Sequence, residues 1–320
     1  MIIDAEDLTR EFVVYEGSGL RRTRRVVRAV DGLTLRVGPG EAVGYIGANG
    51  SGKSTTIKML SGILTPTSGS VQTCGLRPVQ ERRALARKIG VVFGQRSALW
   101  WDLPLEESFP ILAAMHRIPG ATWRARFDTL VDELELSSFL ARPVRTLSLG
   151  QRMRGEVAAA LLHSPELAIL DEPTIGLDMI SKENLRRFLA RERTERGTTL
   201  LLTTHDMGDV QRLCDRMVVI DAGRVAFDGT EAGLIAATDA ERILVVDLAA
   251  PVEQLPLPDG AILQATEGDG TRLSIAFRPQ VLSAAQVLGA VQAHAEVVEL
   301  SLAEPAIEDL VRRIYARGAL

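Results

Sequence analysis

Three short runs of apolar residues stand out from the mixed hydrophobic and polar pattern of the chain. They cover residues 42–46, 167–170 and 198–202. Continuous apolar runs of this length are typical of parallel strands that are buried on both faces of a sheet. Glycines follow the first run, two acids follow the second, and threonines and a histidine follow the third. We therefore expect an α/β core whose polar groups gather at the carboxyl ends of its strands.

The glycine-rich stretch after the first run, GANGSGKST, fits the pattern G-x-x-x-x-G-K-[ST]. Glycines let the backbone turn with positive φ, so that successive N–H groups converge on phosphate oxygens, and Lys53 adds a positive charge. A helix over residues 55–60 would direct its positive end at the same anion, and Ser54 is placed to bind Mg²⁺. The alternative is a simple glycine-rich turn. The predicted nucleotide-binding residues are Gly47, Asn49, Gly50, Ser51, Gly52, Lys53, Ser54 and Thr55.

The other two runs end in residues suited to phosphoryl transfer. Asp171 would hold Mg²⁺, and Glu172 is placed to polarise the attacking water. His205 follows the third run and would contact the γ-phosphate. The alternatives are solvated acids in a turn at the end of a strand and a structural histidine.

Together these motifs resemble the ATP-binding subunit of ABC transporters over roughly residues 2–230. GANGSGKST resembles the Walker A motif of that family, LAILDE its Walker B motif, LSLGQ its signature loop, and residues 175–178 its D-loop. The resemblance makes His205 the switch histidine. It makes Gln95 a glutamine that contacts the metal and the reacting phosphate. It also places Phe12 against the adenine ring, although an aromatic residue on a strand is often simply part of the core.

The same resemblance implies a fold. Residues 1–229 would form a P-loop NTPase cassette, with a RecA-like core, an antiparallel β layer, and a helical subdomain at about residues 97–164. Within that subdomain, residues at helical spacing between Trp123 and Leu134 predict an inward-facing helix. Trp100 and Trp101 are adjacent and cannot both face one core from a regular element, so at least one is expected at the surface or in a turn. They would form either a packed turn or an anchor for a permease helix.

The signature loop departs from the family pattern LSGGQ, because Leu149 stands at the first glycine position. In the family this loop grips the γ-phosphate of ATP bound to the opposite subunit, which assigns that role to Ser148, Gly150 and Gln151. The family places the loop too far from the P-loop of its own chain to close on the same nucleotide. A homodimer with two ATP molecules between its subunits, and with Asp178 near the joint, is the simplest solution. A heterodimer with a sister subunit is the alternative.

Composition limits the partners of this 320-residue chain. Its net charge of −4 gives no basic footprint for nucleic acid. The N-terminal residues lack the features of a signal peptide, and no apolar stretch approaches the length of a membrane span. We expect a peripheral protein on the cytoplasmic face of the membrane, whose permease is a separate chain.

Residues 230–320 change in character and predict a small α+β accessory domain. Strands are expected at residues 243–248, 261–266, 271–277 and 297–302, and helices at 279–294 and 305–317. Dimer contact, regulation and permease docking all remain open as its role. At the other end, residues 2–37 predict short strands interrupted by an arginine-rich stretch. That stretch would be either a solvated hairpin tip or a contact for anionic lipid.

The run FGQRSALWWDLP, with LSLGQRMR and DEPTIGLD, resembles ATPases of ABC-2-type exporters, including the drug-resistance and viologen-exporter group. The expected function is therefore ATP hydrolysis that powers export of small molecules or drugs, with ATP and Mg²⁺ as cofactors. The alternatives are a soluble ABC ATPase acting on ribosomes or DNA without a permease, and a nucleotide-gated module that has lost hydrolysis.

Overall fold

The computed structural model describes residues 1–16, 23–93, 97–204, 206–238, 240–252 and 255–318. The chain divides into two compact units, Met1–Asp228 and Gly229–Leu320. Within the described residues, no helix has the length and apolar character needed to cross a bilayer.

The first unit is built on a six-stranded sheet with the order β5-β6-β7-β3-β8-β9. Neighbouring strands from β5 to β8 are parallel. The strands are β3 (Ala42–Gly47), β5 (Ile89–Val92), β6 (Leu167–Asp171), β7 (Thr199–Thr203), β8 (Arg216–Asp221) and β9 (Arg224–Gly229). The prediction that residues 42–46, 167–170 and 198–202 form parallel strands is confirmed, and the structure shows in addition that β6, β7 and β3 are neighbours in this order. Because they are parallel, the polar residues that follow them meet at one edge of the sheet.

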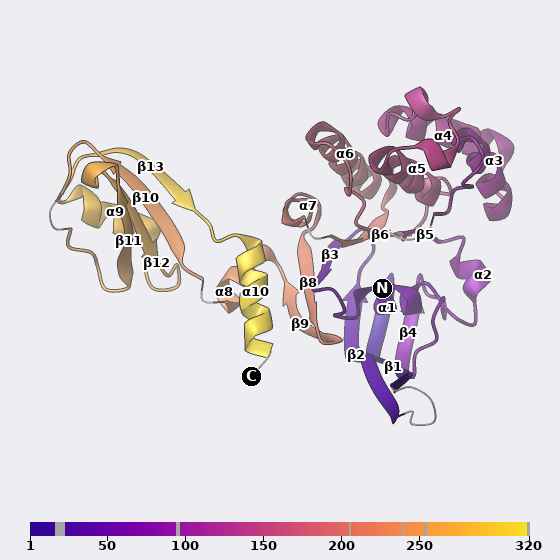
Figure 1. Ribbon diagram of the computed structural model, residues 1–320, viewed down its shortest axis with the longest axis horizontal. Helices are drawn as coiled ribbons and strands as arrows, with labels where there is room; N and C mark the ends of the chain where they lie inside the picture. Colours follow the sequence, from indigo (N-terminus) through magenta and orange to yellow (C-terminus); the bar gives the residue numbers. More distant parts are fainter. Residues whose placement is uncertain (17–22, 94–96, 205, 239, 253–254, 319–320) are drawn as a thin grey trace. The chain divides into compact units, whose positions relative to one another are not determined.

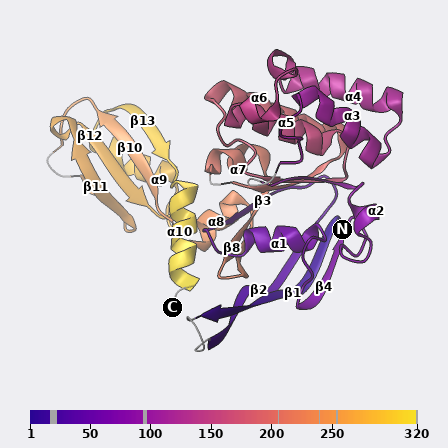
Figure 2. The same cartoon turned by 45° about the vertical axis from the view of Figure 1, so that its right-hand side comes forward.

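Both faces of this sheet are buried, which explains the continuous apolar runs. On β6, Ala168 and Leu170 belong to a core shared with four helices, whereas Leu167 and Ile169 belong to a second core on the opposite face. The four helices are α3 (Leu105–His116), α4 (Gly120–Glu133), α5 (Leu149–Leu161) and α6 (Met179–Arg196). Figures 1 and 2 show them on one side of the sheet. The unit also contains two shorter helices, α2 (Arg82–Leu85) and α7 (Met207–Leu213).

The opposite face is covered by α1 (Lys53–Leu60) and by a separate antiparallel sheet of order β2-β1-β4 (Figure 1). This sheet consists of β1 (Ile3–Glu16), β2 (Thr23–Val37) and β4 (Ser68–Thr73). The arrangement is the predicted cassette, with an antiparallel layer and a helical subdomain on either side of the core.

The prediction of short strands in residues 2–37 was wrong. β1 and β2 are 14 and 15 residues long, and their pairing runs from Ile3 opposite Val37 to the far end of both strands. The arginine-rich stretch belongs to β2, because residues 24–28, with the sequence RRVVR, all pair across to residues 11–15 of β1. The pairing of β4 stops at Thr9, so the rest of the hairpin is a two-stranded ribbon. The other two arginines of the stretch, Arg21 and Arg22, lie outside the described residues.

Two predictions for the helical subdomain are confirmed, namely the inward-facing helix between Trp123 and Leu134 and the exposure of one tryptophan of the adjacent pair. Helix α4 carries Leu130 and Val131 into the core, with Trp123 and Phe127 packed against it. Of the tryptophan pair, Trp100 packs against the same core, whereas Trp101 is 50% exposed with the guanidinium of Arg152 over its ring.

The second unit is a four-stranded antiparallel sheet of order β11-β12-β10-β13 with a helix on one face. Its elements are α8 (Glu231–Ala237), β10 (Arg242–Leu248), β11 (Ala261–Glu267), β12 (Arg272–Phe277), α9 (Ala284–Gln292), β13 (Val297–Ala303) and α10 (Ile307–Gly318). The predicted strands are confirmed, but the helix predicted from residue 279 begins five residues later. Ser283 and Gln286 form a capping box there, which sets the start of α9.

Candidate functional site

The predicted phosphate loop connects β3 to α1 in the way its glycines require. Gly50 and Gly52 have φ of 84° and 106°. A β-carbon on Gly52 would lie 2.3 Å from the carbonyl oxygen of Ala29, so a larger residue has no room. Gly52 caps α1 without a side-chain hydrogen bond. The first amides of α1 are therefore available to an anion at the helix N-terminus.

The loop and the acidic strand end line a single pocket of about 580 Å³. Its lining residues are Ala29, Asn49, Gly50, Gly52, Lys53, Ser54, Thr55, Leu149, Asp171, Glu172 and Ile175. Most of the predicted phosphate and metal residues are thus brought together. Gly47 and Ser51 are not part of the lining. The two residues pack closely against each other. A β-carbon on Gly47 would lie only 2.3 Å from Ser51 Oγ.

Lys53 is the cation of this pocket. Its Nζ donates hydrogen bonds to the carbonyl oxygens of Gly47 and Ala48, the latter at 3.0 Å. Burial lowers the pKa of Lys53, while the charges of Asp171 and Glu172 act in the opposite direction. The ammonium group is therefore partly desolvated, which strengthens its attraction for phosphate, while the two nearby carboxylates keep it protonated.

Asp171 and Glu172 are fixed by the neighbouring strand. Thr203, the last residue of β7, donates a hydrogen bond from Oγ1 to Asp171 Oδ1, and its carbonyl oxygen accepts the N–H of Glu172 at 2.8 Å. Glu172 has φ of 52°, a left-handed conformation that costs a non-glycine residue about 1–2 kcal/mol. Strain of this kind concentrates at functional sites, where surrounding contacts maintain it. Nothing in the local sequence predicts it.

The residues in the pocket fit a magnesium ion by their chemistry. Ser54 supplies a hydroxyl oxygen and Asp171 a carboxylate oxygen, and both lie on the lining. Hard oxygen ligands of this kind, completed by phosphate and water, are what Mg²⁺ prefers.

The signature loop begins helix α5. Ser148 is its N-cap in a capping box, accepting from the N–H of Gln151 at 3.2 Å, while Gln151 Oε1 accepts the N–H of Ser148 at 3.1 Å. Leu149 lies on the lining of the pocket of its own chain, with its side chain directly against Gly176. Ser148, Gly150 and Gln151 are not part of that lining, and their predicted contact with the ATP of an opposite subunit stays a prediction.

Asp178 is the N-cap of α6. Its carboxylate accepts the N–H and the hydroxyl of Ser181, at 2.9 and 2.8 Å. These hydrogen bonds lower the pKa of Asp178, and the one from the backbone N–H has the larger effect. Its predicted position near a dimer joint stays a prediction.

Three further predicted residues are not placed in the pocket. Gln95 and His205 lie outside the described residues. Phe12 lies on β1 opposite Val27, with the guanidinium of Arg10 over its ring at 4.7 Å, and is not part of the pocket lining. Sequence reasoning missed Ala29, Leu149 and Ile175 as lining residues. Ala29 belongs to no motif, and it reaches the pocket through the position of β2 in the fold, so the sequence alone could not indicate it.

A strand, glycine-rich loop and helix that face an acidic strand end define a P-loop nucleotide-binding ATPase. Residues 30–175 match the family model described as ABC transporter. The chain is 34% identical over 289 residues to the daunorubicin resistance ATP-binding protein DrrA3 of Streptomyces coeruleorubidus, which covers 88% of this chain and 90% of the relative. The chain therefore belongs to the ATP-binding proteins of ABC transporters, and is an ATPase.

Further similarities agree. The Nod factor export ATP-binding protein I of Paraburkholderia xenovorans is 40% identical over 212 residues, which are 65% of this chain and 67% of that protein. The solved structure of an ATP-binding subunit of an ABC transporter superimposes with a TM-score of 0.64 at 27% identity, over 74% of this chain and 93% of the other. A dimeric ATP-binding cassette in a post-hydrolysis state, bound to ADP and phosphate, gives a TM-score of 0.63 at 25% identity, over 71% and 98%.

Proposed function

We propose that this chain hydrolyses ATP to power export of small molecules or drugs through an ABC-2-type permease that is a separate chain. The observation that carries the catalytic part is the single pocket shared by the phosphate loop and the two strand-end acids. The similarity to DrrA3, which extends over most of both chains, supports export. The protein would act at the cytoplasmic face of the membrane, held there by its permease.

In this proposal each residue of the pocket has one task. Lys53 and the amides of residues 49–55 bind the β- and γ-phosphates. Ser54 and Asp171 would hold Mg²⁺, which neutralises phosphate charge when bound. Glu172 orients and polarises the attacking water, whose oxygen bonds to the γ-phosphorus as the bond from phosphorus to the bridging oxygen breaks.

The proposal extends to residues contributed from outside this pocket. Gln95 and His205 would contact the metal and the γ-phosphate, and Phe12 the adenine. Two copies of the chain would enclose two ATP molecules, with Ser148, Gly150 and Gln151 of each copy gripping the ATP held by the other. Asp178 would lie near the joint. The dimeric cassette among the similar structures supports this arrangement.

Purified Glu172→Gln protein tests the proposal by size-exclusion chromatography with light scattering. Without a group to polarise water, the variant should bind ATP and Mg²⁺ and accumulate as a dimer, whereas ADP should leave it monomeric. Its ATP turnover should fall at least about 100-fold relative to wild type. A monomer under all conditions would contradict the homodimer and leave a sister subunit as the partner. Wild-type turnover by the variant would contradict the role of Glu172.

A further inference from the structure

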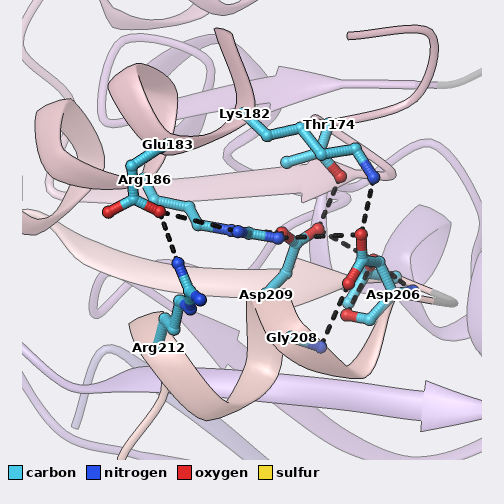
Figure 3. A network of polar contacts seen from close by, with 9 residues as sticks. Thr174, Lys182, Glu183, Arg186, Asp206, Gly208, Asp209 and Arg212 are labelled. Atoms are coloured by element: carbon cyan, nitrogen blue, oxygen red, sulfur yellow. Dashed lines mark hydrogen bonds and ion pairs between the residues drawn. The ribbon is translucent and has the colours of Figure 1, made fainter. Parts of the chain in front are cut away.

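One buried carboxylate, that of Asp209 on α7, ties together three segments next to the pocket (Figure 3). Asp209 is 1% exposed. Its Oδ2 accepts the hydroxyls of Thr174 at 2.5 Å and Thr204 at 3.2 Å. Its Oδ1 accepts Nε and Nη2 of Arg186, at 2.7 and 2.5 Å. These three partners of the carboxylate lie outside α7.

These partners belong to the segments that carry the reactive groups. Thr174 lies within the turn that starts at Glu172, in which the N–H of Ile175 donates to the carbonyl oxygen of Glu172 at 3.1 Å. Thr204 directly follows Thr203, which binds both acids of the pocket. Arg186 lies on α6, the helix that begins after Asp178. Asp209 therefore connects the ends of β6 and β7 to α6.

A rim of more exposed charges surrounds this buried centre. Lys182 donates to Asp206 at 2.6 Å, and Arg212 donates to Glu183 at 2.6 Å. Glu183 also lies 3.7 Å from Arg186. Asp206 also touches the centre, because its N–H donates to Thr204 Oγ1 at 2.9 Å and its Oδ2 lies 3.6 Å from Arg186 Nη2. Glu183 and Arg212, in contrast, contact neither threonine in the described part of the chain, so Glu183 can be changed without removing a partner of Thr174 or Thr204.

We propose that Asp209 is a positioning residue for ATP hydrolysis, which holds Glu172 in its strained conformation by anchoring Thr174 and Thr204. This inference rests on the proposed role of Glu172. A left-handed glutamate persists only while its surroundings maintain it. Two of the contacts that do so are the hydrogen bond from its N–H to the carbonyl oxygen of Thr203 and the turn in which Thr174 is fixed to Asp209. Without that anchor the turn can relax and displace the carboxylate, and a displacement of about 1 Å can lower turnover about 100-fold.

Thr174→Val tests this directly, because valine keeps the shape of the side chain and removes the hydroxyl. We expect kcat to fall about 10- to 100-fold, while the KM for ATP changes less than about threefold, since the phosphate loop is untouched. Thr174→Ser retains the hydroxyl and should keep kcat near the wild-type value. The matched control is Glu183→Gln in the rim, which should leave kcat unchanged. Thermal melting and binding of a fluorescent ATP analogue establish that each variant is folded and loaded.

A second variant keeps the proposal testable if Thr174→Val does not fold. The double variant Asp209→Leu with Arg186→Leu replaces the buried ion pair by apolar groups of similar size, which proteins often tolerate. It should fold and bind nucleotide but lose kcat to a similar extent as Thr174→Val. Wild-type kcat in either folded variant would overturn the positioning role. If Glu172→Gln itself hydrolyses ATP at the wild-type rate, the proposed function fails instead, so the two failures are distinguishable.

Discussion

The side chain of Leu149 fills the space that a β-carbon at Gly176 would need. Its Cγ lies 2.8 Å from that position, and Gly176 has φ of 73°. The next residue of the signature loop, Gly150, is equally close, because a β-carbon there would lie 2.5 Å from the carbonyl oxygen of Gly176. The signature loop and the D-loop of one chain are therefore packed as a unit, with Leu149 as the side chain between them.

Gly176→Ala should destabilise the protein by about 1–3 kcal/mol, because alanine is strained at this φ and collides with Leu149. Adding Leu149→Gly should restore the part that is due to the collision, about 1 kcal/mol, while the backbone strain remains. Urea denaturation of the two single variants and the double variant measures this coupling. Strictly additive effects would mean that the two residues are not in contact.

The ion pair between Arg126 and Glu192 should have a large effect on stability when it is broken. The two side chains are each 5% exposed and form two parallel hydrogen bonds at 2.9 and 2.6 Å. Arg126→Ala leaves Glu192 buried without this partner and should lower the free energy of unfolding by about 3–5 kcal/mol.

The comparison variant for this pair is Arg126→Met with Glu192→Leu. Replacing both charges by apolar groups should be close to neutral. Arg191→Gln, which breaks the more exposed pair with Glu133, should cost less than about 1 kcal/mol. Equal losses in the buried and exposed pairs, measured by urea denaturation, would contradict the interpretation.

His163 should make stability depend on pH. Burial lowers the pKa of His163 to about 4, and the charge of His116, stacked on it at 3.9 Å, adds to the shift. Burial and then the charge of Arg87 lower the pKa of His116 as well. Nε2 of His163 contacts the carbonyl oxygen of Ile89 at 3.0 Å and Nδ1 is buried without a partner among the described residues, so the folded protein holds the neutral ring.

Because the unfolded histidine titrates near its ordinary pKa of 6.5, the unfolded chain binds the extra proton first as the pH falls. The contribution of His163 is full above pH 6.5 and is lost between pH 6.5 and 4, by about 3 kcal/mol. Denaturation across this range should show a smaller slope for His163→Gln than for wild type. The exposed His294→Gln serves as the control and should keep the wild-type slope. Identical slopes in all three proteins would refute the prediction.

Lys53→Met should abolish stabilisation by ATP without lowering the stability of the free protein. A ligand at 100 times its dissociation constant raises the free energy of unfolding by about 2.7 kcal/mol, and the variant should lose this increment. Thermal melting with and without ATP and Mg²⁺ measures it. Lys58→Met, on the exposed side of α1, is the matched control and should behave as wild type.

The sequence was sufficient to predict the elements whose physical cause is local. Buried strands such as β6 need continuous apolar residues, and the phosphate loop needs glycines where φ is positive, so both are visible in the residue pattern. What was missed depends on tertiary pairing. The arginine-rich part of β2 resembles a loop until it is paired with β1, and Ala29 reaches the pocket only through that pairing. The strained backbone of Glu172 is likewise imposed from outside, by Thr203.

The capping box of α5 has a chemical consequence for Ser148. Its oxygen accepts the N–H of Gln151, which leaves the hydroxyl hydrogen free of that bond. The hydroxyl group of Ser148 can thus cap the helix through its oxygen and still donate a hydrogen bond to an anion through its hydrogen. Aspartate caps helices as well as serine does. However, an ionised aspartate cannot donate a hydrogen bond, and its negative charge would repel the negatively charged phosphate. Serine and aspartate would therefore serve the fold of α5 equally well at this position, but only serine could also fill the role proposed here for Ser148 in binding ATP.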